Sequence, residues 1–212
     1  MQIIRGDDYQ SWVYSNKDDL IVVDPWLTQK QVFPRYNWLL NRDSTQTPYL
    51  LKYNLIDKVT HIIITAHFSD HLDEESLKIF KKNIPIYTTH EASKILSKLG
   101  FTNINVVTSN NTYELNSLTI KICKAGKPYN TTTFSYLLDD SRSKVFHEPH
   151  MFNPKLELED VDDLNFFWET SSAVGNAASP IPNAPQSTAM ICIVLPKPIW
   201  SARMQPVLEL TC

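Results

Sequence analysis

Glycine and cysteine are both scarce in this sequence of 212 residues. Only 4 glycines are present and no two stand close together, which excludes the glycine-rich phosphate-binding loops of P-loop and dinucleotide-binding proteins. The three cysteines, Cys123, Cys192 and Cys212, are scattered and form no CxxC pair. This odd, dispersed set favours a reducing compartment and no disulfide framework, so we expect a cytoplasmic protein.

Long apolar runs and a large net charge are absent as well. No apolar run approaches the roughly 18 residues of a membrane span, and the charged Arg5, Asp7 and Asp8 do not fit a signal peptide. The formal net charge of -3 argues against a broad nucleic-acid surface. We therefore expect a small-molecule substrate as partner, with no nucleic acid and no membrane. The sequence does not indicate the oligomeric state.

The chain is organised around the stretch THIIITAHFSDHLDEESL, residues 60–77. Its short, β-branched run at residues 62–64 predicts a buried strand. The acidic run near its end predicts the first turn of a helix, where the helix dipole favours negative charge. His67, Asp70 and His71 fall in the loop between them. Because α/β proteins place their chemistry at the carboxyl ends of strands, these three are candidate site residues.

The rest of the first three quarters of the chain predicts strands and one further helix. In residues 28–57 the apolar residues follow neither helical nor strand spacing, which indicates a long insertion or flap. A helix is expected over residues 91–99, capped by Thr88 or Thr89 and ended by Gly100. Apolar periodicity predicts further strands at residues 2–4, 11–14, 20–23, 84–87, 103–107, 113–115, 118–123, 134–138 and 144–146.

Asp24 is a further candidate, because it follows a buried strand and precedes Pro25. A site carboxylate and a turn-capping carboxylate explain this position equally well. His61 and His90, at the start of a strand and of a helix, are expected to be structural or exposed histidines.

A second polar cluster, His147-Glu148-Pro149-His150, ends the strand predicted at residues 144–146. His147 alternates with Phe146, so its side chain could simply face solvent. His150 is better placed as a ligand because it lies just past the strand and Pro149 restricts the backbone there.

In this order of elements and motifs the chain resembles the metallo-β-lactamase superfamily, and within it the lactonase-like branch with Asp-His and Glu-Pro-His motifs. The resemblance covers roughly residues 2 to 155. It implies an α/β (α+β) fold, an αββα sandwich whose second half is incomplete here. The family's central motif is His-x-His-x-Asp-His, to which His67, Asp70 and His71 correspond, while Ser69 stands in place of the second His.

The resemblance also implies roles for these residues. His67, Asp70 and His71 correspond to metal ligands, and His150 falls where the family carries a metal-bridging Asp. Asp24 corresponds to a strand-end Asp that does not bind the metal itself. It hydrogen-bonds one of the side chains that do. Two family ligands have no counterpart, because no His occurs at residues 124–134 or after His150.

The residue types themselves favour the same chemistry. A hydrolytic metal needs about three protein ligands and one open position for water. His67, Asp70, His71 and His150 offer nitrogen and oxygen donors that suit one divalent ion, zinc first and manganese or iron as alternatives. Asp70 could orient the water or accept its proton, and Glu148 could hydrogen-bond an imidazole.

These observations predict a metal-dependent hydrolase that acts on a small ester, lactone or phosphoester. The alternative is a catalytically inactive relative that serves as a binding or scaffold domain, which Ser69 and the missing late His favour. The simplest alternative is that Ser69 and Asp70 merely cap the following helix.

The last part of the chain differs in character. We expect a metallo-β-lactamase-like domain over residues 1–163 and an irregular, Pro-rich tail over residues 164–212. One strand is predicted at residues 190–195, directly before Pro196. The tail lacks the strand-helix units of the complete fold, so we expect a truncated or altered C-terminal part.

Overall fold

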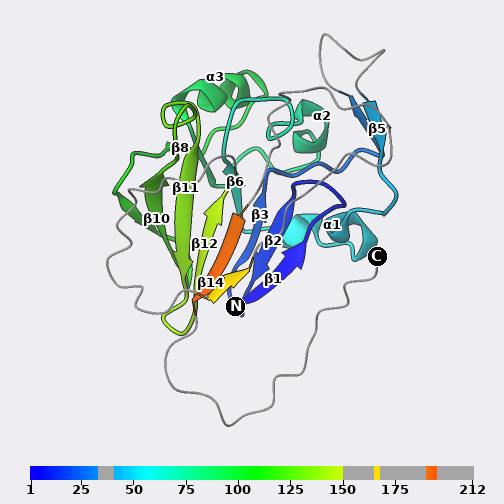
Figure 1. Ribbon diagram of the computed structural model, residues 1–212. Coiled ribbons are helices and arrows are strands. Elements are labelled where there is room, and N and C mark those ends of the chain that lie inside the picture. The colour runs from blue at the N-terminus through cyan, green and yellow to red at the C-terminus, as the bar shows by residue number, and fades with distance from the viewer. Residues whose placement is uncertain (33–40, 150–164, 168–189, 195–212) are drawn as a thin grey trace, which may run out of the picture.

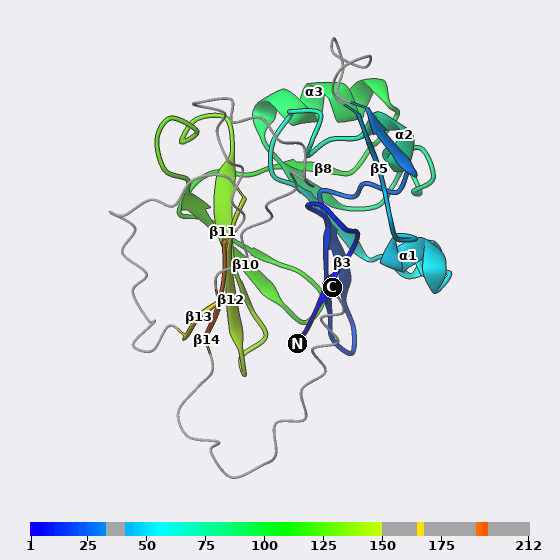
Figure 2. The same cartoon turned by 45° about the vertical axis from the view of Figure 1, so that its right-hand side comes forward.

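The computed structural model describes residues 1–32, 41–149, 165–167 and 190–194. Two six-stranded sheets face each other, and the helices lie over the outer side of the first sheet (Figures 1 and 2). This mixed α/β arrangement confirms the predicted fold class. Within the described ranges, no helix has the length and apolar character needed to cross a membrane.

The first sheet combines an antiparallel start with a parallel continuation. Its order is β1-β2-β3-β6-β7-β8. Strands β1 to β3 pair antiparallel, whereas β3, β6, β7 and β8 pair parallel. The carboxyl ends of β3 and β6 therefore meet at one edge, which brings Asp24 to the loop after β6. The strands are β1 (Gln2–Arg5), β2 (Trp12–Ser15), β3 (Leu20–Val23), β6 (His61–Ile64), β7 (Ile86–Thr88) and β8 (Ile104–Val106).

The second sheet is antiparallel throughout, in the order β13-β14-β12-β11-β10-β9. A single bridge between Ala66 and Thr133 ties it to the loop after β6. Its strands are β9 (Thr112–Glu114), β10 (Thr119–Lys124), β11 (Phe134–Asp139), β12 (Lys144–Glu148), β13 (Asn165–Phe167) and β14 (Met190–Val194).

The helices and the small sheet complete the described part of the chain. The predicted flap at residues 28–57 holds a two-stranded sheet, β4 (Lys30–Val32) and β5 (Asn41–Asp43), and a helix. The helices are α1 (Tyr49–Lys52), the 3-10 turn η1 (Ile56–Lys58), α2 (Glu74–Leu77) and α3 (His90–Lys98).

Both ends of helix α3 confirm the capping residues predicted from the sequence. The Thr89 hydroxyl accepts a hydrogen bond from the Ala92 N–H and caps the start of the helix. Gly100, with φ of 86°, lies in the left-handed region just after the end of the helix, a conformation that glycine adopts without steric cost.

Helix α2 begins at the acidic run, as the sequence predicts. It is one turn of four residues, and its N-cap is Asp73, which accepts from the Ser76 N–H. Ser69 and Asp70 therefore do not cap it, so that simple alternative for the central motif is wrong. Leu77, Phe80 and Ile84, at the end of this helix and after it, are buried in the core against the first sheet.

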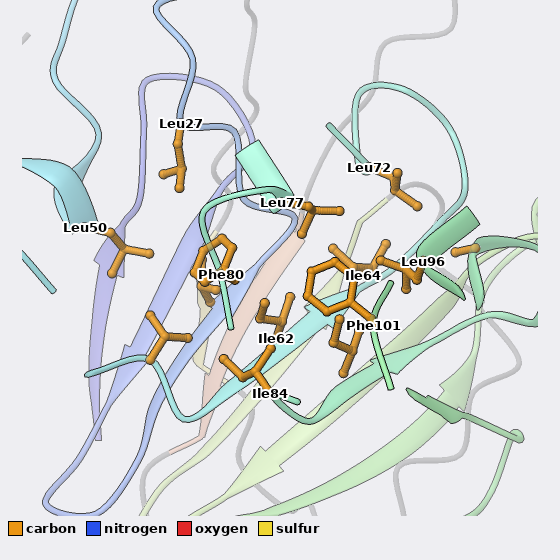
Figure 3. Close-up of a cluster of buried hydrophobic side chains, with 14 of the residues drawn as sticks. Leu27, Leu50, Ile62, Ile64, Leu72, Leu77, Phe80, Ile84, Leu96 and Phe101 are labelled. Carbon is orange, nitrogen blue, oxygen red and sulfur yellow. The ribbon is translucent and has the colours of Figure 1, made fainter. Parts of the chain in front are cut away.

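Two apolar clusters hold the layers together. The first lies between the first sheet and the helices, where Leu50, Leu77 and Leu96 pack on Ile62 and Ile64 (Figure 3). The second fills the space between the two sheets and includes Ile63. Strand β6 is thus buried on both faces, as expected for a central parallel strand.

The part of the chain beyond residue 163 contributes to the second sheet. The strand predicted at residues 190–195 is present as β14, which pairs with β12 on one side and β13 on the other. The division of the chain at residue 163 stays a prediction.

Candidate active site

Asp24 directs its carboxylate into the loop that follows β6. Its Oδ1 accepts from the Thr65 N–H at 2.8 Å, and its Oδ2 accepts from the Thr65 hydroxyl at 2.5 Å and from His71 Nδ1 at 2.7 Å. Asp24 is 3% exposed. Of the two sequence alternatives, a turn cap or a site residue, these contacts support the second, because the carboxylate spans from the end of β3 to the central motif.

His71 is buried and oriented by this carboxylate. A carboxylate only accepts, so His71 Nδ1 carries the proton and donates it to Asp24. His71 Nε2 faces Asp70, whose Oδ2 lies 3.6 Å away. Burial lowers the pKa of His71, but the charge and hydrogen bond of Asp24, with a smaller contribution from Asp70, leave it raised above its ordinary value.

His67 and Asp70 are both half-buried in the same loop. The His67 ring packs on Phe68, with ring centroids 4.5 Å apart. Its Nδ1 is buried, and no hydrogen-bond partner for it occurs among the described residues. A buried nitrogen without a partner is costly, which makes it a candidate for a ligand contact.

His147 does not face solvent, so that alternative for its side chain is wrong. It is 1% exposed and points into the space between the sheets. Its Nδ1 lies 2.7 Å from the Tyr136 hydroxyl and 3.1 Å from the Tyr14 hydroxyl. Burial lowers the pKa of His147 to about 4, while Asp24 raises it and His71 lowers it further. The imidazole is therefore a neutral hydrogen-bonding group within the core.

Glu148 and His150 complete the predicted set. Glu148 is 1% exposed and follows His147 on β12, so strand alternation places it on the opposite face of that strand. Its predicted hydrogen bond to an imidazole stays a prediction. His150 lies outside the described residues.

Comparison with known proteins places this chain in a family. Residues 7–165 match the family described as "Beta-lactamase superfamily domain". The chain belongs to this family. The predicted superfamily is thereby confirmed, and the hydrolase-like fold with it.

The individual relatives of this beta-lactamase superfamily chain are distant. It is 29% identical over 105 residues to the UPF0173 protein YddR of Bacillus subtilis, covering 48% of this chain and 41% of YddR. The chain therefore spans less than half of that relative's length.

Solved structures show the same fold. A "possible metal-dependent hydrolase" from Veillonella parvula aligns with a TM-score of 0.50 and 16% identity, covering 65% of this chain and 56% of its own. An isothiocyanate hydrolase from Delia radicum gut bacteria aligns with a TM-score of 0.52 and 17% identity, covering 67% and 59%. At these identities the likeness shows the fold alone.

The described residues fit part of a metal site. One solved structure with this fold is described as a possible metal-dependent hydrolase. A carboxylate that fixes one imidazole nitrogen and leaves the other directed at a ligand position is the usual support of a metal-binding His. Asp24 and His71 have this arrangement, with Asp70 next to the second nitrogen. Within the described ranges, no three His, Cys, Asp or Glu side chains gather closely enough to hold a metal ion.

Two residues that contribute to the site, Thr65 and Ser11, were not predicted from the sequence. Thr65 donates to both carboxylate oxygens of Asp24, and the available signal was a small polar residue directly after the β-branched run. Ser11 bonds the backbone around Asp24, and no local pattern distinguishes it, because the contact joins residues 13 positions apart.

Proposed function

We propose that this chain is a metal-dependent hydrolase that acts on a small ester, lactone or phosphoester. One divalent ion, zinc first and manganese or iron as alternatives, would be held by Asp70 and His71, together with His67 and His150. The observation that carries the proposal is the chain of contacts from Asp24 through His71 to Asp70, at 2.7 and 3.6 Å.

Each residue of the proposed site would have a distinct role. A bound divalent ion lowers the pKa of a coordinated water toward neutrality. Asp24 holds the Nδ1 proton of His71 and keeps the ring in one orientation. Asp70, partly exposed beside His71 Nε2, would orient the attacking water or accept its proton. Glu148 would hydrogen-bond a ligand imidazole.

The proposal extends to the setting in which the chain works. We propose a small molecule as partner, with no role for nucleic acid or a membrane surface. A cytoplasmic location is supported by the three dispersed cysteines.

An inactive binding or scaffold domain is the second candidate. Ser69 favours it, since this position carries a His in the family motif that the chain resembles. The two candidates differ in one property, the metal content of the folded protein.

Elemental analysis of the purified chain therefore tests the proposal. We expect about one equivalent of zinc, manganese or iron, lost in His71→Ala and in Asp70→Ala. His90→Ala removes an exposed imidazole outside the site and should keep the metal. A metal-loaded protein then justifies a screen of esters, lactones and phosphoesters. Folded protein without metal, or metal that survives both site substitutions, would contradict the proposed function.

A further inference from the structure

Asp24 is held in a backbone conformation that its sequence context disfavours. Its φ is 43°, in the left-handed region that non-glycine residues seldom adopt. It also precedes Pro25, and the residue before a proline is restricted to extended conformations. Such a conformation is unfavourable for a non-glycine residue and persists only where its surroundings impose it.

Ser11 supplies that restraint. Its Oγ lies 2.8 Å from the carbonyl oxygen of Asp24 and accepts from the N–H of Trp26 at 2.8 Å. Pro25 has no N–H, so one hydroxyl binds the backbone groups on both sides of it. Ser11 is 1% exposed, which keeps water from replacing these bonds.

Ser11 is itself fixed by the turn between β1 and β2. Its N–H donates to Asp7 Oδ1 at 3.0 Å, and its carbonyl accepts from the Gly6 N–H at 2.7 Å. The approach to Gly6 is so close that a Cβ at that position would lie 2.9 Å from the Ser11 Cβ. The hydroxyl therefore has a defined position relative to the first sheet.

The protons around the Ser11 hydroxyl can be counted. The oxygen has one proton of its own, and its neighbours are the Asp24 carbonyl and Asp7 Oδ2, 3.0 Å away. An Asp7 carboxyl that carries a proton can donate it to Ser11 Oγ, which leaves the Ser11 proton for the Asp24 carbonyl. An ionised Asp7 competes for that proton instead.

We propose that Ser11 is a positioning residue of the candidate site. By holding the backbone on both sides of Pro25, its hydroxyl sets the direction of the Asp24 carboxylate and, through the Asp24–His71 hydrogen bond, that of His71 Nε2. The consequence for metal binding rests on the proposed function, whereas the consequence for His71 is a property of the protein without metal.

The test compares two hydroxyls at opposite ends of β3. Ser11→Ala removes the hydroxyl beside Asp24, and Thr60→Ala removes one that bonds both backbone groups of Leu20. Ser11→Thr keeps the hydroxyl. NMR of the ring nitrogens in 15N-histidine-labelled protein, assigned with His71→Ala, reports the exchange rate of the His71 Nδ1 proton. Zinc titration reports affinity.

In Ser11→Ala we expect the His71 Nδ1 proton to exchange about 10-fold faster, the equivalent of one weakened hydrogen bond. Ser11→Thr and Thr60→Ala should keep the wild-type rate. If zinc binds, its affinity should fall about 10-fold in Ser11→Ala alone. If Ser11→Ala does not fold, Ser11→Cys keeps the side-chain volume, weakens both bonds and carries the same expectation.

Equal exchange rates in Ser11→Ala and Thr60→Ala, at equal loss of stability, would overturn the positioning role. A wild-type protein that binds no zinc, manganese or iron would overturn the proposed function, while the His71 measurement would still decide the role of Ser11. The experiment therefore distinguishes a failure of the Ser11 proposal from a failure of the proposed function.

Discussion

Asp7 illustrates how a single buried carboxyl couples the fold to pH. Burial raises the pKa of Asp7 to about 6, with a small further increase from Asp8, although hydrogen bonds from the Tyr9 and Ser11 N–H groups lower it. Asp7 thus binds its proton more tightly in the folded protein than in the unfolded chain. Its contribution to stability is full at acidic pH and declines as pH rises through its folded pKa.

The first prediction concerns this residue. Between pH 4 and pH 6 the free energy of unfolding should fall by up to about 3 kcal/mol through Asp7 alone, because a tenfold difference in proton affinity corresponds to about 1.4 kcal/mol. Asp7→Asn should lack this decline, because its amide can accept from both N–H groups and donate to Ser11 Oγ. Urea unfolding of both proteins across this range isolates Asp7, since other titrations are shared. Parallel pH profiles would contradict the assignment.

At the scale of an element, β6 carries the strongest agreement between sequence and structure. Its short β-branched run predicts a buried strand, and the strand lies at the centre of the first sheet. Alternate side chains serve different layers: Ile62 and Ile64 face the helices, and Ile63 faces the second sheet. Continuous apolar sequence is what a strand covered on both faces requires.

The second prediction follows from this double burial. Ile62→Ala and Ile63→Ala should each reduce the free energy of unfolding by about 2 to 5 kcal/mol, because both side chains are fully buried. Ile79→Ala, on an exposed side chain next to α2, is the control and should change stability little. Chemical denaturation measures all three. A small effect of Ile63→Ala would show that the second sheet does not pack on β6.

At the scale of the whole molecule, polar contacts join the two sheets as well as apolar ones. Asp19, in the turn before β3, is 2% exposed. It accepts from the Ser117 N–H and hydroxyl, both at 2.8 Å, in the turn between β9 and β10. Its Oδ1 also lies 3.3 Å from His61 Nδ1, so His61 is a structural histidine, as expected.

The third prediction tests this link between the sheets. Asp19→Ala leaves the Ser117 N–H without its acceptor, so the free energy of unfolding should fall by about 1 to 3 kcal/mol. The neighbouring Asp18 is exposed, and Asp18→Ala should cost far less. Thermal unfolding compares the two variants. Equal shifts in the melting temperature would argue against a structural link through Asp19.

Much of this architecture was open to prediction, and the exceptions have physical causes. Apart from β13, for which no strand was predicted, the strands of both sheets and helix α3 follow from local periodicity and caps. The start of helix α2 also follows from the sequence, because its acidic first turn and its Asp73 cap are local features. His147 was hard to place, because alternation assigns it to a face of β12 without saying whether water or a second sheet covers that face.

The sequence by itself determined the fold class, the family and the presence of His67, Asp70 and His71 at the end of a buried strand, since these depend on short-range pattern and motif. Only the tertiary structure decided that Asp24 holds Thr65 and His71, that Ser11 holds Asp24, and that Tyr14 and Tyr136 enclose His147. Each of these contacts joins residues from different strands or loops. Their geometry depends on sheet register and layer packing, which no local pattern encodes.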